Sequence, residues 1–341
     1  MDTGVDRAVA PRPSQPNTVA IYYLNVKTFG RSTGGRATAA AAYRAGERIR
    51  DERTGQSFDH SRRVDVMHKE IVLPATLAAT DMSWVRDRAS LWNAAELIES
   101  RKNAAVAREY LVALPHELTH GQRLGLAQKF SHELADRHGF AVDLVIHAPR
   151  PHGDARNFHA HLLTTTREIL PTGLGAKTDS ELTSSKRPER GLGSKLKELY
   201  LVRERWATLT NEALQEANLE VRVDHRSLRA QGIDREPGPW IPEGAWRSET
   251  QGRRSEIAER IREAYRARVQ ARLERAVARV SSVGSAGKLD EIRRLARQSW
   301  LQIRDPRRGT FAAPDPARSK SRELQKERDV GRNEPDDDVA L

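Results

Sequence analysis

The sequence predicts an α+β fold in which helices pack on an antiparallel sheet. Short segments with the two-residue alternation of strands are interspersed with amphipathic helical segments. Segments 140–148 and 158–166 are strand-like and are joined by nine residues of turn formers, which is typical of an antiparallel hairpin. Long apolar runs of the kind found in parallel sheets are absent from the sequence. The expected divisions are a flexible N-terminus (1–18), a main domain (19–245), a basic helical extension (246–304) and a disordered tail (305–341).

The first elements follow from local composition. Segment 19–27, VAIYYLNVK, is β-branched and aromatic and predicts a strand. A Gly-rich basic loop over 28–36 leads to an Ala-rich helix expected over 37–52, because Ala is the best helix former. A turn at 54–56 and a second strand at 68–74 follow.

The remaining elements are indicated by periodicity and capping. Segment 81–103 has apolar residues at three-, four- and seven-residue spacings, which predicts one amphipathic helix. Segment 105–115 alternates as a strand. A helix over 118–139 is expected to begin at Thr119, an N-cap residue, and to end at Gly139. Two later helices are expected over 196–218 and 255–280.

Composition narrows the partners and the chemistry. The 58 Lys and Arg residues exceed the 47 Asp and Glu residues, and the net charge of +11 favours a polyanionic partner, most often nucleic acid. The chain has no cysteine, which excludes disulfides and thiolate metal sites, so any metal must be held by His, Asp or Glu. The N-terminus lacks the apolar segment of a signal peptide and no stretch is long enough to span a membrane, so a cytoplasmic protein is expected.

Histidines mark the two strands of the predicted hairpin. His159 and His161 are two residues apart and therefore project from the same face of one strand. His147 lies on the partner strand and, in a suitable register, completes a three-histidine cluster with open coordination positions, as a catalytic metal requires. A solvated strand face or a set of hydrogen-bonded histidines is the alternative. His152, in the connecting loop, is a rival for the third ligand.

Several separated stretches, taken together, resemble a known family. They are IYYLNVK, GRSTGG, AAAAYRAGERI, DERTG, AREYLVALPHELT, IHAPRPHGDARNFHAHLLTTTRE and DHRSLRAQGIDREPG. In this order they resemble the MobA/MobL family of plasmid mobilisation relaxases, which are HUH-type endonucleases (His, a hydrophobic residue, His). The resemblance runs from about residue 20 to 240 and implies the palm-like fold of HUH relaxases. It also implies a site- and strand-specific nick in single-stranded DNA at an origin of transfer, which initiates conjugative mobilisation.

The resemblance also implies a mechanism and its partners. A tyrosine attacks the scissile phosphate and leaves a 5′-phosphotyrosyl protein with a free 3′-OH. The family's nucleophile corresponds to Tyr43. A divalent ion, Mg²⁺ or Mn²⁺ with Zn²⁺ as a further candidate, is held by three histidines that correspond to His147, His159 and His161. Accessory mobilisation proteins and a coupling protein are the expected protein partners.

Other residues near these motifs are candidates for further roles. Tyr22 and Tyr23 compete with Tyr43 as nucleophiles, although they lie on an expected core strand. Glu109 is the candidate acidic partner, either orienting a ligand histidine or taking the tyrosine proton. Two departures from the family concern these positions, because Leu111 stands where members often carry a second acid and Tyr23 where they often carry His.

Basic residues supply candidates for DNA contact. The Gly-rich loop offers Arg31 and Arg36 beside flexible backbone N–H groups, which suit a phosphate. A single-strand groove would be lined by further cations, and each of these has a solvated surface charge as its alternative. The candidates for that groove are Arg44, Arg48, Lys177, Lys186 and Arg187.

Three other functions are compatible with parts of this pattern. A rolling-circle replication initiator or a transposase would share the HUH chemistry. A non-catalytic nucleic-acid-binding protein would share the charge. A three-histidine metallohydrolase acting on a small molecule would share the metal site, but the net charge of +11 argues against it.

Overall fold

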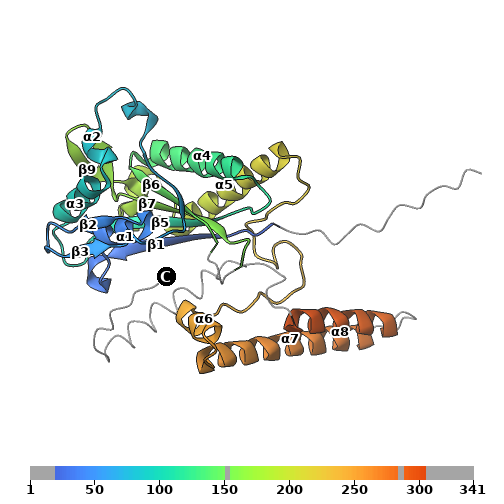
Figure 1. The fold of residues 1–341 in the computed structure, drawn as a ribbon. Helices are drawn as coiled ribbons and strands as arrows, with labels where there is room; N and C mark the ends of the chain where they lie inside the picture. The colour runs from blue at the N-terminus through green and yellow to red at the C-terminus, as the bar shows by residue number, and fades with distance from the viewer. Residues whose placement is uncertain (1–19, 150–153, 283–287, 305–341) are drawn as a thin grey trace, which may run out of the picture.

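The computed structural model describes residues 20–149, 154–282 and 288–304 (Figure 1). The expected flexible N-terminus, His152 and the expected disordered tail lie outside the described residues. The central element is a five-stranded sheet in the order β1-β5-β7-β6-β4, in which every neighbouring pair is antiparallel. Its strands are β1 (Leu24–Gly30), β4 (Val66–Val72), β5 (Ala105–Leu114), β6 (Val142–His147) and β7 (Phe158–Thr164). The predicted α+β class with an antiparallel sheet is confirmed.

Helices cover both faces of this sheet (Figure 1). On one face, α4 and α5 enclose a core that includes Phe130, Trp206 and Leu162. On the other face, α1 and α3 enclose a second core that includes Trp92 and Leu163. The helices are α1 (Ala37–Ala45), α2 (Ser83–Arg86), α3 (Arg88–Ile98), α4 (His120–His138), α5 (Lys195–Glu216), α6 (Glu243–Thr250), α7 (Glu256–Ser282) and α8 (Lys288–Arg304).

Two small hairpins and several 3₁₀ turns complete the described fold, and the sequence did not indicate the hairpins. Their strands are β2 (Arg48–Arg50), β3 (Ser57–Asp59), β8 (Arg167–Leu170) and β9 (Gly173–Lys177). The 3₁₀ turns are Arg31–Thr33, Ala75–Leu77, Asp179–Glu181 and Pro188–Arg190.

Helix α1 is shorter than the sequence predicted. It ends at Ala45 because Gly46 adopts a left-handed conformation with φ of 61° and donates its N–H to the Ala42 carbonyl, which is a common helix stop. The chain then turns back as the β2–β3 hairpin instead of continuing helically to residue 52. The C-terminal end of α1 is thereby left facing the sheet.

The helix predicted over 81–103 is divided in two. Asp87 leaves the helical conformation between α2 and α3, and its carboxylate caps α3 by accepting a hydrogen bond from the Ser90 N–H at 2.7 Å. The predicted limits of α4 are confirmed, since Thr119 caps it in a reciprocal pair with Gln122 and Gly139 ends it in the left-handed region.

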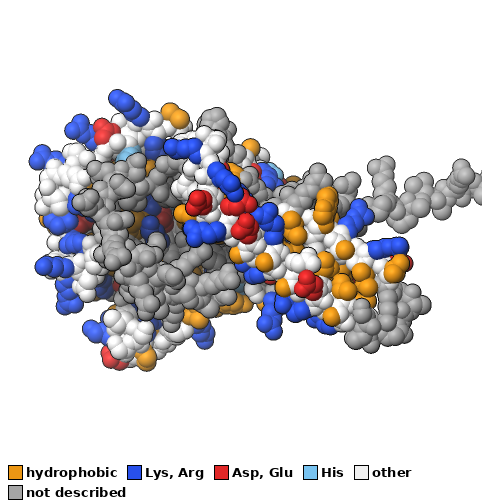
Figure 2. Space-filling view, turned by 90° about the horizontal axis from the view of Figure 1, so that it is seen from below, with side chains coloured by type: hydrophobic (Ala, Val, Ile, Leu, Met, Phe, Trp, Pro, Cys, Tyr) orange, Lys and Arg blue, Asp and Glu red, His pale blue; other side chains and the backbone are white. Residues whose placement is uncertain are grey.

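The last helices form a separate layer below the sheet in the view of Figure 1. Helix α7 corresponds to the helix predicted over 255–280, and α8 and most of α6 lie in the expected basic helical extension (246–304). Hydrophobic side chains gather on the surface of the α7–α8 pair, and Lys and Arg side chains are scattered over the rest of this face (Figure 2). None of the helices in the described part of the chain combines the length and apolarity that a membrane crossing requires.

Candidate active site

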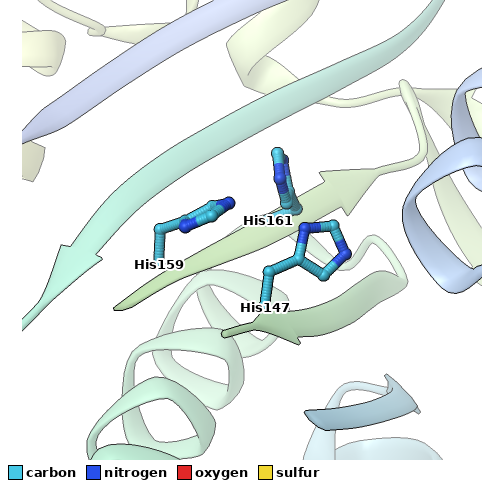
Figure 3. A group of neighbouring side chains, drawn as sticks. All are labelled: His147, His159 and His161. Carbon is cyan, nitrogen blue, oxygen red and sulfur yellow. The ribbon is translucent and has the colours of Figure 1, made fainter. Parts of the chain in front are cut away.

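Three histidines converge at one end of the β6–β7 hairpin. His147 and His159 are directly paired across the two strands, and His161 lies two residues further on the same face. Their rings point toward one another (Figure 3), with centroids separated by 5.3 Å for His147 and His159, 4.8 Å for His147 and His161, and 5.2 Å for His159 and His161. One nitrogen from each ring lies within 4.8 Å of the other two. The register that the sequence left open brings all three together.

Each of these imidazoles has one nitrogen bonded to an acceptor. His161 donates from Nδ1 to Glu109 Oε1 at 2.6 Å, and His159 donates from Nδ1 to the Asn157 carbonyl at 3.0 Å. His147 donates from Nε2 to the Arg44 carbonyl at 2.8 Å. Carbonyl and carboxylate oxygens only accept, so these contacts assign the proton-bearing nitrogen of each neutral ring. The opposite nitrogen then carries the lone pair that a metal ion needs.

The site has the properties of a divalent-cation site. Nε2 of His161 is buried and has no hydrogen-bond partner among the described residues. Such an orphaned polar atom costs about 1–3 kcal/mol unless a ligand satisfies it. Three neutral imidazoles suit ions such as Mn²⁺ or Zn²⁺, and they leave coordination positions for substrate. The residues therefore fit the divalent ion that the sequence predicted.

Burial makes the cluster sensitive to acid. Burial first, and then the neighbouring His161, lowers the pKa of His147 to about 3, and burial also lowers the pKa of His161. In the unfolded chain these groups titrate near pH 6.5, so below that pH the unfolded state binds more protons and stability falls. For His147 alone we expect a loss of about 2 kcal/mol between pH 6.5 and 5, at about 1.4 kcal/mol per pH unit.

Urea denaturation in EDTA at pH 7 and pH 5 measures this effect. In the His147→Gln variant the stability should depend less steeply on pH than in the wild type, because one of the titrating groups is gone. Equal slopes in the two proteins would show that His147 is not held neutral by the fold.

Glu109 joins the cluster to helix α1. Its side chain is 4% exposed and accepts from Arg44 Nε at 2.5 Å as well as from His161. Burial raises the pKa of Glu109, but the Arg44 charge and the His161 hydrogen bond together outweigh burial and hold that pKa well below its usual range. A carboxylate that binds protons so weakly is a poor base. The geometry thus favours the orienting role over proton transfer.

Tyr43 lies in the last turn of α1 and is half-buried. Its carbonyl accepts a hydrogen bond from Arg63 Nη1 at 2.8 Å, and the Arg63 guanidinium lies 4.3 Å from the centre of its ring. The His60 ring lies nearly perpendicular to the same ring, at a centroid distance of 5.1 Å. The next carbonyl along the chain, that of Arg44, is the acceptor for His147. The end of α1 therefore ties the candidate nucleophile to the histidine cluster.

The two rival tyrosines are placed differently. Tyr22 packs in the core on the opposite face of the sheet, where its hydroxyl donates to the Arg203 carbonyl at 2.8 Å. The Tyr23 carbonyl bonds to the Ala113 N–H, and Ala113 pairs with His159, so Tyr23 shares the face of the histidines. Burial and then the charge of Glu109 raise the pKa of Tyr23. Leu111, the departure from the family's second acid, is the direct strand partner of His161.

Two of the predicted DNA contacts, Arg44 and Arg187, are buried, which leaves little of either side chain on the surface. Arg44 is 4% exposed and binds Glu109, and Arg187 is 3% exposed and binds Glu198 and two carbonyl oxygens. Arg31 is tied to Glu96 and to the Glu99 carbonyl. Lys177 is tied to Glu99, Thr166 and the Ala105 carbonyl.

The other three candidates remain near the surface. Arg36 is half-buried, bonds to Gln56 at 2.7 Å and lies over the Phe58 ring. Arg48 and Lys186 are exposed. Arg63 and Asp65 were not predicted from the sequence, although RRVD places opposite charges two residues apart just before a strand. No local periodicity marks Arg63, since its contacts with Tyr43 and His147 come from α1 and β6.

Arg44 and Arg48 make a matched pair for testing this assignment. Arg44→Met removes one partner of a buried ion pair and should lower the free energy of unfolding by about 3 kcal/mol. Arg48→Met should change stability by less than about 0.5 kcal/mol, but weaken DNA binding and reduce its salt dependence. Urea denaturation and DNA retention at several salt concentrations check both. If Arg44→Met instead weakened DNA binding and left the free energy of unfolding unchanged, Arg44 would again be a candidate for DNA contact.

Comparisons with known proteins show which family the chain is similar to. A model of the MobA/MobL family matches residues 36–253, which include Tyr43 and all three histidines. The chain is similar to the Mobilization protein MobL of Acidithiobacillus ferridurans, with 38% identity over 241 residues that cover 64% of this chain and 61% of the relative. It is also similar to the Probable mobilization protein MobA of Bifidobacterium longum (strain NCC 2705), with 34% identity over 251 residues that cover 64% and 42%. The chain thus spans about half the length of these relatives.

A solved structure resembles the main part of the chain. It is described as "Molecular Basis of Vancomycin Resistance Transfer in Staphylococcus aureus" and shares 30% sequence identity, with a TM-score of 0.51. The similarity covers 61% of this chain and 100% of that one.

Proposed function

Because this chain belongs to the MobA/MobL family, we propose that it is a DNA relaxase that nicks one strand at a plasmid origin of transfer and so initiates conjugative mobilisation. The observation that carries the proposal is the convergence of three imidazole nitrogens within 4.8 Å, beside the helix end that presents Tyr43. Relatives named as mobilisation and conjugal transfer proteins support the same role. We assign the reaction to residues 19–245.

In the proposed reaction the Tyr43 oxygen attacks the scissile phosphorus and the phenolic proton is lost. A bond forms between this oxygen and phosphorus, and the bond from phosphorus to the 3′-oxygen breaks, so the DNA 5′-phosphate becomes attached to Tyr43. The departing 3′-oxygen takes up a proton and becomes a free 3′-OH. The phosphodiester is conserved as a phosphotyrosine, which allows the strand to be rejoined.

The remaining residues of the site prepare this step. When bound, a divalent cation supplies positive charge beside the scissile phosphate. His147, His159 and His161 would hold it through the nitrogens opposite those that bond to the Arg44 carbonyl, the Asn157 carbonyl and Glu109. Glu109 keeps the His161 ring oriented, and the buried Arg44 keeps Glu109 ionised.

The DNA would reach the site along basic surface. The net charge of +11 supplies non-specific attraction to single-stranded DNA, and Arg36, Arg48 and Lys186 are the candidates left near the surface. Accessory mobilisation proteins and a coupling protein are the proposed partners in the cell, as the roles of the relatives suggest.

A covalent-capture experiment tests the proposal. Single-stranded oligonucleotides, labelled at the 3′ end and tiled across the plasmid region beside the gene, are mixed with the protein and Mn²⁺. One oligonucleotide should give a labelled band on a denaturing gel that protease removes and EDTA prevents. Salt-sensitive retention of DNA with no covalent band from any oligonucleotide would instead identify a binding protein and overturn the proposal.

A further inference from the structure

Arg63 lies where helix α1, strand β6 and the chain before β4 meet. Its Nη1 donates to the Tyr43 carbonyl at 2.8 Å, and its guanidinium covers the Tyr43 ring at 4.3 Å. Its Nη2 lies 3.3 Å from Nδ1 of His147, the nitrogen that faces the other two histidines (Figure 3). Arg63 therefore contacts both the candidate nucleophile, Tyr43, and one member of the candidate metal cluster, His147.

Asp65 holds the plane of this guanidinium. It accepts from Nε of Arg63 at 2.8 Å and from Nη2 at 2.5 Å, a two-point contact that leaves little freedom of rotation. The hydrogen bond from Arg63, against the effect of burial, lowers the pKa of Asp65 to about 2, so the pair stays charged at neutral pH. The two-point contact with Asp65 therefore sets the orientation of the guanidinium against which the Tyr43 ring packs.

Close packing fixes the position of the same segment relative to α1. A Cβ placed on Gly46 would lie 3.3 Å from the Arg63 Cβ, so the chain carrying Arg63 passes tightly against the end of the helix. The His60 ring, from the same segment, packs nearly perpendicular to the Tyr43 ring. Tyr43 thus packs against two side chains from residues 60–65, those of His60 and Arg63.

We propose that Arg63 is a positioning residue that holds the Tyr43 phenol beside the histidine cluster, in a pose set by Asp65. This inference rests on the proposed function of Tyr43 as nucleophile. Arginine is required because a planar guanidinium bonds at two points and stacks on a ring at the same time. A lysine ammonium is a point charge that does neither. The charge of Arg63 alone is therefore insufficient.

Arg63→Lys and Asp65→Asn test the proposal, with Arg62→Lys as the matched control, because Arg62 is the exposed neighbour. The rate of adduct formation is measured in a single turnover at saturating DNA and Mn²⁺. We expect Arg63→Lys to lower the rate about 100-fold, as a displacement of a reacting group by about 1 Å does. Asp65→Asn should lower the rate about 10-fold, because the Arg63 guanidinium would be held less firmly. Arg62→Lys should leave the rate unchanged.

Two affinities separate positioning from a general structural defect. The dissociation constants for DNA, by fluorescence anisotropy, and for Mn²⁺, by electron paramagnetic resonance, should stay within about threefold of the wild type, because the three histidines keep their own acceptors. An unchanged adduct rate in Arg63→Lys overturns the proposal. A loss of Mn²⁺ affinity that matches the loss of rate also overturns it, since Arg63 would then act through the metal cluster. If Arg63→Lys does not fold, Asp65→Asn decides by the same criteria.

A measurement on the DNA-free protein keeps this inference distinct from the proposed function. The ring ¹³C signal of Tyr43 is assigned by its absence in Tyr43→Phe. In Arg63→Lys it should shift and broaden while the signal of the distant Tyr22 does not change. An unmoved Tyr43 signal refutes the positioning role, whether or not the wild-type protein forms an adduct. A wild-type protein that forms no adduct refutes the proposed function.

Discussion

Tyr43→Phe should abolish the covalent DNA adduct and leave DNA affinity unchanged. The substitution removes one oxygen and keeps the ring that packs against Arg63 and His60, so the fold and the DNA surface should be preserved. Without the phenolic oxygen no bond to phosphorus forms, and we expect the adduct rate to fall by at least about 1,000-fold. The labelled band on a denaturing gel measures the rate, and fluorescence anisotropy measures binding.

Tyr23→Phe is the matched control for this variant. Tyr23 shares the face of the sheet with the histidines, but burial and Glu109 raise its pKa and make it a poor source of phenolate. Its phenylalanine variant should form the adduct at close to the wild-type rate. Adduct formation that survives Tyr43→Phe and disappears in Tyr23→Phe would transfer the nucleophile to Tyr23.

His161→Ala should lose metal binding and cleavage together. His161 is 1% exposed, and its Nε2 is a buried atom with no hydrogen-bond partner within the described chain. Deleting this ring removes one of three ligands and leaves Glu109 with one fewer donor. We expect Mn²⁺ affinity to fall at least about 100-fold. Losing a residue that only orients a ligand lowers metal affinity by up to about 100-fold, and His161 is itself a ligand in the proposed site. Isothermal titration calorimetry and the adduct gel measure the two losses.

A second histidine controls for the loss of an imidazole as such. His132 lies exposed on α4, which covers the opposite face of the sheet, and His132→Ala should retain both Mn²⁺ affinity and cleavage. Full cleavage by His161→Ala at ordinary Mn²⁺ concentrations would contradict the three-histidine site. Excess Mn²⁺ should restore part of the activity, because the other two ligands remain.

The histidine cluster was predictable because strand geometry is local. The two-residue period places His159 and His161 on one face from sequence spacing alone, and a hairpin loop of turn formers brings His147 to the neighbouring strand. The third ligand depended on the strand register, which the sequence left open. The observed pairing of His147 with His159 supplies that register.

The buried charges were not predictable in the same way. Arg44 looks like a surface cation in the sequence, but it bonds to Glu109, which is 65 positions away in the chain. Arg63 carries no periodic signal, and its contacts with Tyr43 and His147 arise only when α1 and β6 come together. The end of α1 illustrates a different error, since the helix propensity of the Ala run was given more weight than the stop at Gly46.

The three groups that accept hydrogen bonds from the imidazoles come from different parts of the chain, which limits how the site can be transferred to another protein. Asn157 belongs to the chain of the β6–β7 hairpin, whereas the Arg44 carbonyl comes from α1 and the Glu109 carboxylate from β5. A hairpin grafted onto another scaffold would therefore bring every ligand but only one of the groups that select the correct tautomers. A functional transplant must include the helix end and the central strand, so the smallest portable unit of this site is three-dimensional and discontinuous in the chain.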